Sequence, residues 1–331
     1  MPDVFLTRRQ ILGAKIETTY GTYATPTPSN SYEAIRLVDP FVGDFGQNMV
    51  EVSGGNLSRG RTRPIATTRP AGVTFRTYVH GITSPASGFI YTANQKPALG
   101  DLFRACGMQE AFESAGYAGG RYRYQQTADP SSDNSVSILC HEDGFDHQLR
   151  GCRGNVNFIY AGATPVIAEF ALRGIIGTEA ATVRAAPTNL PTIVPPRWIG
   201  SGSIFVESLH AVVNAANFQT GNTIFEQPAS IADSSAGIIQ CVITDRVPGG
   251  SMDPEVTNAS TLDFFAQWRA TSGAILQLQT NVTTGNRFTL TASQMIIKTL
   301  DRGDNSGLRI FNTGFEAYER NVDDSFQLLF D

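Results

Sequence analysis

The chain is poor in the residues that hold nucleic acid tightly. Its 331 residues include 25 basic ones, of which only Lys15, Lys96 and Lys298 are lysines, and the formal net charge is −5. Tight nucleic-acid binding comes mainly from neutralising phosphates, so this charge balance argues against a surface built for it. The other basic residues are arginines, which favour fixed planar contacts of the kind found between protein surfaces.

Cysteines, long apolar runs and catalytic motifs are also scarce. The chain has no CxxC pair, which predicts reduced thiols at Cys106, Cys140, Cys152 and Cys241. No run of about eighteen apolar residues occurs, so we expect no membrane-spanning helix. There is no Gly-x-Ser-x-Gly nucleophile elbow and no phosphate loop followed by lysine and a helix. We therefore expect neither an enzyme nor a cofactor.

One group of residues resembles a zinc site but has the wrong geometry. Cys140, His141, His147 and Cys152 are ligand types for zinc. Asp143-Gly144 predicts a two-residue hairpin turn, which pairs Cys140 with His147 and turns His141 to the other face. Continued alternation puts Cys152 on that other face too. At most two ligands converge, whereas structural zinc needs four, and the sequence assigns no role to either histidine.

Strand patterns dominate what is present. In 150–174, apolar residues alternate with polar ones on both sides of a Gly-Ala-Thr-Pro turn, which predicts an antiparallel hairpin. The predicted core side comprises Val156, Phe158, Tyr160, Val166, Ala168, Phe170 and Leu172. Residues 73–79 predict another strand. Residues 97–112 predict the best helix, ended by Gly107.

The second half of the sequence repeats the element order of the first. Residues 209–225 correspond to 35–50, the loop 248–260 to a loop at 53–70, and 261–273 to the strand 73–81. A second hairpin is expected from 286–298 and 307–316, and a closing strand over 325–331. We predict an extended arm (1–31), a first domain (32–180), a Pro-rich linker (181–203) and a second domain (204–331). Only the first domain is expected to contain a helix.

Three segments are candidates for contacts between subunits: the N-terminal arm, the loop 53–70 and its counterpart 248–260. The arm has too few apolar residues to order itself, so it is either disordered or laid on a partner; its aromatic residues include Tyr20 and Tyr23. The loop 53–70 contains Arg59, Arg61, Arg63 and Arg69. Without interleaved aromatic residues it is a poor nucleic-acid patch. A solvated loop and a loop docked on a neighbouring subunit remain open.

Several stretches together resemble the tail tube (major tail) proteins of long-tailed bacteriophages. They are 14–27, 97–107 with its helix and Gly107, 149–162 with the strand that ends at Gly174, the Gly-Asn-Arg-Phe strand at 285–288, 304–307 and 323–330. They span nearly the whole chain in the expected order. The combination carries the resemblance, since no single motif is specific.

The resemblance implies a mainly β protein with two tandem tail-tube-like β-sandwich or barrel domains, which assemble into a ring-wide β-barrel around a DNA-conducting lumen. With two such domains per chain, a ring of six domains needs three chains. We therefore expect a trimeric, pseudo-hexameric ring, with a homohexamer as the alternative. A trimer carries 3 × −5 = −15 formal charges, which repels phosphates and lets DNA pass without sticking.

The implied role is structural. The chain stacks as rings in the virion tail after assembly in the host cytoplasm, next to tape measure, tail terminator and distal tail proteins. The polar side of the 150–174 hairpin faces either the lumen or a neighbour, through Asn155, Asn157, Glu169 and Arg173. The alternative function is a carbohydrate- or receptor-binding β-sandwich of the virion. Such a protein usually has clustered exposed aromatic residues, whereas the only tryptophans are Trp198 and Trp268.

Overall fold

The fold is mainly β, with 61% of residues in strands and 6% in helices. A computed structural model describes residues 9–27, 33–51, 63–81, 91–93, 95–114, 120–162, 164–182, 203–207, 209–228, 236–256, 258, 261–280 and 286–331. The predicted linker lies almost wholly outside these ranges.

The elements of the first half precede residue 182. They are β1 (Gln10–Ile16), β2 (Ala34–Ile35), β3 (Val42–Asp44), β4 (Met49–Val50), β5 (Ile65–Ala66), β6 (Pro70–Tyr78), α1 (Gly100–Ala105), β7 (Met108–Glu113), β8 (Arg121–Gln126), the 3-10 turn Pro130–Ser132, β9 (Val136–Glu142), β10 (Phe145–Ala161) and β11 (Ile167–Ala181).

The second half begins at residue 203. Its elements are β12 (Ser203–Val206), β13 (Leu209–Ala211), β14 (Val213–Gln219), β15 (Asn222–Pro228), β16 (Ile238–Arg246), β17 (Gly249–Pro254), α2 (Phe264–Ala270), β18 (Ala274–Gln279), β19 (Phe288–Asn305), β20 (Leu308–Tyr318) and β21 (Phe326–Phe330).

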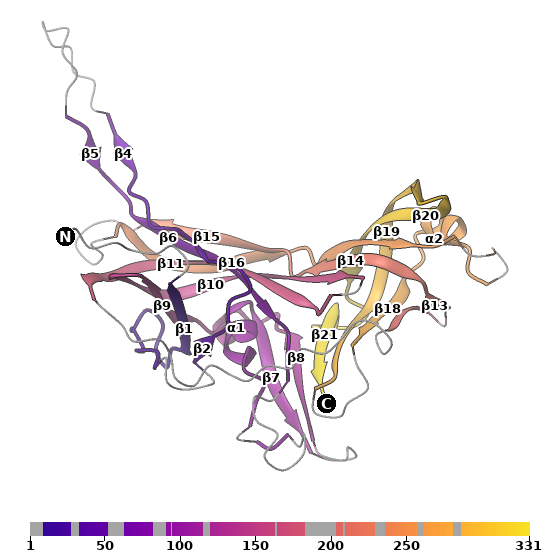
Figure 1. The fold of residues 1–331 in the computed structure, drawn as a ribbon, viewed down its shortest axis with the longest axis horizontal. Helices are drawn as coiled ribbons and strands as arrows, with labels where there is room; N and C mark the ends of the chain where they lie inside the picture. Colours follow the sequence, from indigo (N-terminus) through magenta and orange to yellow (C-terminus); the bar gives the residue numbers. More distant parts are fainter. Residues whose placement is uncertain are drawn as a thin grey trace, which may run out of the picture.

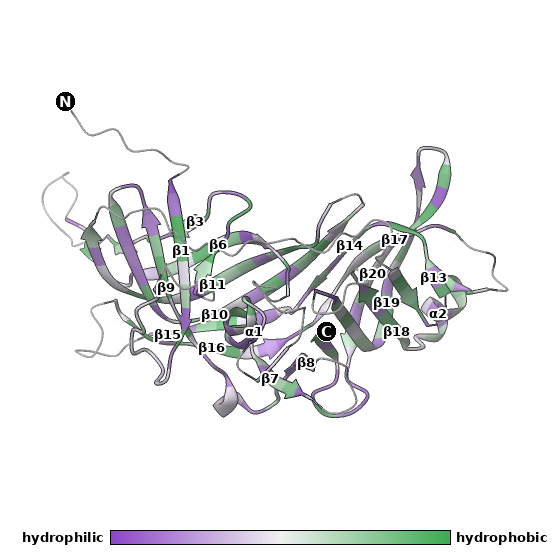
Figure 2. Ribbon diagram, turned by 60° about the horizontal axis from the view of Figure 1, so that its bottom comes forward, coloured by the Kyte–Doolittle hydropathy of each residue, from purple (hydrophilic) through white to green (hydrophobic). Residues whose placement is uncertain are grey.

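The hairpins expected in the first half are confirmed. Asp143-Gly144 joins β9 to β10, and His141 lies opposite Asp146 as predicted. β10 and β11 pair from Ile159–Ile167 outward, and the seven apolar side chains predicted for their core side are all buried. Strand β6 is also confirmed, and Figure 2 shows hydrophilic and hydrophobic residues alternating along the strands.

Several expectations need correction. The N-terminal segment is not a free arm over its described length, because 10–16 form β1. β1 pairs with β9 of the same chain and buries Leu12 and Ala14 in the core. The predicted helix 97–112 is shorter: α1 ends at Ala105, and Gly107, at φ +76°, turns the chain into β7.

Two expectations for the second half are wrong. The predicted loop 248–260 contains β17, which lies between β14 and β20. Its Gly249 and Gly250 let neighbouring backbones approach; a Cβ on Gly250 would lie 2.0 Å from the Asn217 carbonyl oxygen. Residues 261–273, expected to form a strand, contain α2, because Asp263 caps the helix by accepting from the Ala266 amide at 3.0 Å.

Apart from β7–β8, which is found only in the first half, and the pairings of β21, the strand pairings follow the same order in both halves. In the first half they are β1–β2, β1–β9, β9–β10, β10–β11, β11–β6, β6–β3 and the separate ribbon β4–β5. In the second half they are β12–β13, β12–β18, β18–β19, β19–β20, β20–β17, β17–β14 and the separate ribbon β15–β16. Within these pairings, each strand of the second half thus has the same set of neighbours as its equivalent in the first half.

The two halves share one sheet and one core. β10 pairs with β14, and β21 pairs with both β19 and β8. The pairings among the described strands branch and never return to their starting strand, so they do not close a barrel within the chain. Phe330 of β21 stacks against Phe103 of α1 at 5.8 Å and Phe288 of β19 at 5.1 Å. Figure 1 shows the elongated molecule, with β4–β5 projecting at one end and α2 at the other.

Candidate assembly surfaces

A long sheet surface opposite the core is the main candidate site. It runs through both halves on β3, β6, β11, β10, β14, β17, β20 and β19, most of whose apolar side chains point the other way into the core, with Val42 and Ile159 among the exceptions. We call this surface the polar sheet face. Its members are Asp44, Thr74, Arg76, Asn157, Glu169, Arg173, Asn217, Gln219, Ser251, Asp253, Lys298, Thr299, Asp301, Asn312 and Glu316.

Every cation of the polar sheet face has a carboxylate partner. Arg76 pairs with Glu169 across β6 and β11. Arg173 pairs with Asp44 at 2.7 Å, and Lys298 pairs with Glu316 at 3.1 Å. Three cations against five carboxylates leave 3 − 5 = −2 charges, since Asp253 and Asp301 are added to the paired acids. The face is therefore acidic, and its arginines are already engaged.

The four residues predicted for this side of the 150–174 hairpin have different surroundings. Asn157, Glu169 and Arg173 lie on the polar sheet face, where Asn157 is opposite Glu169 in the register. Asn155 instead contacts the ribbon β15–β16 of its own chain. Its Nδ2 donates to the Asn222 carbonyl at 2.7 Å, and its Oδ1 accepts from the Asn222 amide at 2.5 Å.

Tyr20 anchors the N-terminal segment to its own chain. Its hydroxyl donates to the Gly151 carbonyl at 3.2 Å and accepts from the Cys241 amide at 2.7 Å, while the Arg153 guanidinium lies 4.9 Å from the ring centroid. Burial raises the pKa of Tyr20 to about 12. Tyr23 is half-buried in the same segment.

The arginine loop is described only in part. β4 and β5 form a two-stranded ribbon that projects from the body (Figure 1), and Met49, Val50 and Ile65 are more than half exposed on it. Arg63 is exposed, whereas Arg69 is bound to Glu179 at the base of the ribbon. Arg59 and Arg61 lie outside the described residues.

The four residues considered as zinc ligands do not converge on one point. A bulge between Leu149 and Cys152 shifts the register, so Cys152 lies opposite Val136 on the same face as Cys140, contrary to the expected alternation. Burial raises the pKa of both thiols, which keeps them protonated. His141 is bound to Asp146 at 2.6 Å, and His147 stacks on Phe45 with ring centroids 4.0 Å apart. Among the described residues no three potential ligands gather at one point.

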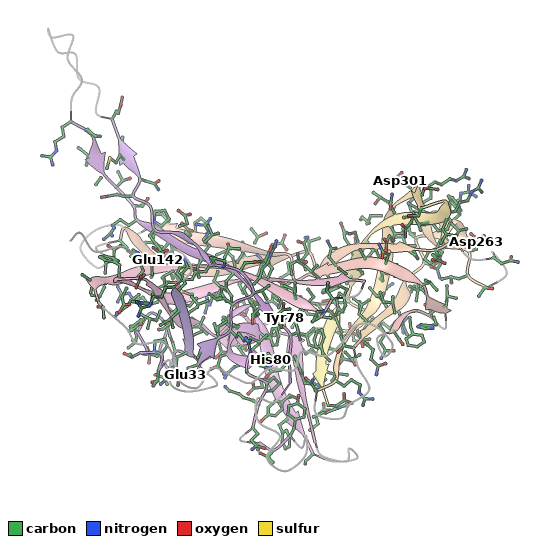
Figure 3. All side chains as sticks on the ribbon, viewed as in Figure 1. Glu33, Tyr78, His80, Glu142, Asp263 and Asp301 are labelled. Atoms are coloured by element: carbon green, nitrogen blue, oxygen red, sulfur yellow. The ribbon has the colours of Figure 1, made fainter. Side chains whose placement is uncertain are left out.

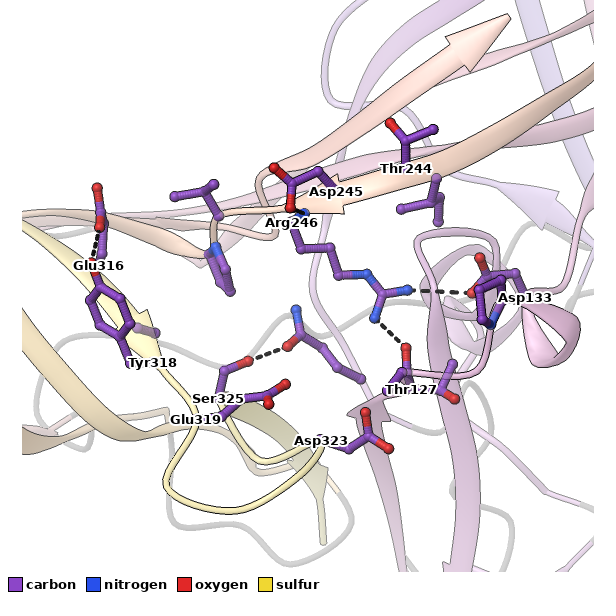
Figure 4. Close-up of a pocket in the computed structure, with 17 residues that line it drawn as sticks. Thr127, Asp133, Thr244, Asp245, Arg246, Glu316, Tyr318, Glu319, Asp323 and Ser325 are labelled. Carbon is purple, nitrogen blue, oxygen red and sulfur yellow. Dashed lines mark hydrogen bonds and ion pairs between the residues drawn. The ribbon is translucent and has the colours of Figure 1, made fainter. Parts of the chain in front are cut away.

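A cavity of about 660 Å³ lies where the two halves meet (Figure 4). Arg246 of β16 reaches across it, donating to the Thr127 carbonyl at 2.6 Å and pairing with Asp133 at 3.3 Å. Desolvation raises the pKa of Asp133, against the lowering influence of the Arg246 charge. The guanidinium therefore acts as a clasp between the halves and is not free for a ligand. Sequence reasoning missed this contact, because nothing local marks two distant loops as neighbours.

Neither a model of a known protein family nor a curated protein sequence matches this chain. In the described part of the chain, both helices are too short to cross a bilayer.

Proposed function

We propose that this chain is the tail tube protein of a long-tailed bacteriophage and has no enzymatic role. Copies form rings, and the rings stack into the hollow tube through which DNA passes into the host. The single observation that carries the proposal is the polar sheet face, a continuous acidic surface that runs through both halves on one sheet. The sequence resemblance supports the same function.

The polar sheet face suits a lumen wall. Duplex DNA carries phosphates along its length, so a wall with free arginines would hold it by counterion release. Here each cation is neutralised at short range by a carboxylate of the same face. The face therefore repels DNA weakly and binds none of it tightly, which is what passage requires.

The two halves act as tandem tube domains in this proposal. Their matching strand pairings give six equivalent domains in a ring of three chains, which favours the trimer over the homohexamer. The ring sits in the virion tail, contacting tape measure, tail terminator and distal tail proteins. The rival carbohydrate-binding function has no support from Trp268, whose indole nitrogen donates to the Lys298 carbonyl at 3.3 Å; Trp198 lies outside the described residues.

The projecting ribbon provides the test. It is joined to the body through 49–51 and 63–69, and its apolar stem is exposed, as expected of a segment that docks on another subunit. Replacing 52–62 by a short Gly-Ser turn should leave a folded chain that no longer stacks into tubes. Negative-stain microscopy of the purified protein at high concentration measures this.

The wild-type chain is expected to form rings and tubes under the same conditions. The matched control, Arg63→Lys, leaves the loop at full length and keeps its charge. It should therefore still form tubes. Tubes of normal length from the deletion variant would show that the ribbon does not contribute to tube assembly. A wild-type chain that stays monomeric at every concentration would overturn the proposed function itself.

A further inference from the structure

Four strand pairings of the described chain have no counterpart in the repeated order: β7–β8, β8–β21, β19–β21 and β10–β14. Of these, β10–β14 alone joins two strands that both belong to the repeat. Seven pairings of the first half recur in the second, with β3 in the place of β14 and β10 in the place of β19. The pairing β10–β14 lies outside this set, because it joins the halves. It is antiparallel and runs from Asn157–Gln219 to Ala161–Ala215.

The repeat therefore predicts a second junction of the same kind. In the junction that exists, β14 of the second half adds to the free edge of β10 in the first half. The equivalent junction joins β3 to the free edge of β19. It cannot form within one chain, because β3 and the end of β19 lie at opposite ends of the molecule; Asp301 of β19 is labelled far from the β4–β5 end in Figure 3.

Both edges are open in the described part of the chain. β3 pairs with β6 on one side only, and Val42 on it is 69% exposed. β19 pairs with β20 along 294–305, while on the opposite side β18 reaches only as far as Met295. Trp268 of α2 covers the Lys298 carbonyl, so the open edge of β19 is 299–305. The backbone N–H and C=O groups along an open edge of this length are unpaired and can hydrogen-bond to a partner strand.

We infer that β3 of one copy pairs antiparallel with residues 299–305 of β19 in a second copy, as β14 pairs with β10 within the chain. This inference rests on the proposed ring and names the two edges that close it. Because the edges differ and lie at opposite ends, the contact is head-to-tail, and repeating it generates a ring if the rotation closes. The covalent chain thus contains one internal example of its own subunit interface.

The internal junction also fixes which faces align. Its pairs place polar-face residues opposite each other, as in Ile159 with Asn217, and core-face residues opposite each other, as in Phe158 with Phe218. On β3, Val42 lies on the polar sheet face and Gly43 on the core side. On β19, Thr299, Asp301 and Asn305 have polar-face parity, whereas Arg302 lies on the other side, against the ring of Phe265.

Engineered disulfides test the alignment. Cross-strand pairs on one face bring Cβ atoms within disulfide range, whereas residues on opposite faces do not meet. Val42→Cys is combined in turn with Thr299→Cys, Asp301→Cys, Gly303→Cys and Asn305→Cys, which together cover every polar-face position of the open edge. The four native cysteines are buried and leave the background clean. Rings or tubes are oxidised, and the cross-linked fraction is measured by non-reducing electrophoresis.

We expect at least one of the four pairs to give covalent multiples of the 35.7 kDa chain in high yield. Val42→Cys with Arg302→Cys should give at least tenfold less, because the faces oppose. Ile159→Cys with Asn217→Cys is the matched internal control; it should form a disulfide yet still run as a single chain.

The outcomes separate this inference from the proposed function. Rings or tubes that form normally, with none of the four pairs above the Arg302 control, overturn the β3–β19 junction and leave the tube function standing. A wild-type chain that forms no ring at all overturns the proposed function and the junction with it.

Discussion

His80 is a buried histidine whose surroundings disfavour the protonated, charged imidazole. The side chain is 4% exposed, and its Nδ1 lies 3.2 Å from the Gly81 carbonyl oxygen. Desolvation lowers the pKa of His80 from 6.5 to about 4, and the Arg36 charge acts in the same direction. The folded chain therefore keeps the imidazole neutral at pH values where the unfolded chain protonates it.

The sign of the resulting pH dependence follows directly. Between pH 6.5 and 4 the unfolded state binds the extra proton, so the free energy of unfolding falls as pH falls through that window. The pKa difference corresponds to a loss of up to about 3 kcal/mol at the acid end. Urea unfolding of the unassembled chain at pH 7, 6, 5 and 4 measures it. His80→Gln should flatten this dependence, whereas parallel wild-type and variant curves would rule out His80 as its source.

At the scale of single residues, alternation correctly predicted which face of a strand the core side chains lie on. It failed near glycines. Alternation placed Phe158 and Phe170 in the core, since a strand has only two faces. It misplaced Cys152, because Gly151, at φ +62°, sits in a bulge that adds residues to one strand. The sequence predicted a loop at Gly249 and Gly250. In the structure, the absence of side chains at these two positions allows β17 to pack between two neighbouring backbones.

The helix α2 shows how a short element depends on its cap. Its seven residues give few internal hydrogen bonds, so the bond from the Ala266 amide to Asp263 at 3.0 Å is a large share of its local stability. Phe264 packs on Phe311 with ring centroids 5.7 Å apart, which ties the helix to β20. Figure 3 labels Asp263 at the same end of the molecule as Asp301.

Removing that cap should cost a predictable amount. Asp263→Ala is expected to lower the free energy of unfolding by about 1 kcal/mol, and Asp263→Ser, which keeps an acceptor oxygen, by much less. Chemical denaturation of the three proteins under one condition gives the comparison. Equal losses from both substitutions would mean that the cap bond contributes little and that packing on Phe311 alone holds α2.

Elements with a periodic core face could be predicted, and elements set by distant partners could not. The hairpins β9–β10, β10–β11 and β19–β20 are each specified by a turn and two alternating arms. The second hairpin was also predicted as an echo of the first, whereas the equivalent of β6 was placed at 261–273 and is in fact β17. The junction β10–β14 and the Arg246 clasp depend on residues more than fifty positions apart, so no local pattern encodes them.

The whole molecule presents one acidic face, and its proposed use depends on that charge. The polar sheet face carries −2 charges per chain and would carry 3 × −2 = −6 in a trimeric ring. Tubes of the wild-type chain are therefore expected to retain no duplex DNA at moderate salt. Gln219 and Asn312 are exposed on this face, in β14 and β20.

Removing the net negative charge of the face should make the tube retain DNA that it otherwise lets pass. Gln219→Lys with Asn312→Lys adds two positive charges per chain and makes the ring neutral on this face; position 312 lies opposite Asp301, whereas position 219 lies opposite Asn157 and Gly249. Retention of fluorescent duplex DNA by pelleted tubes should rise with the substitutions and fall steeply as salt increases. The control, Ala128→Lys with Val322→Lys, adds the same charge at exposed positions off the sheet. Equal DNA retention by the two double variants would mean that the polar sheet face does not line the lumen, because only charge at the wall changes how DNA moves along it.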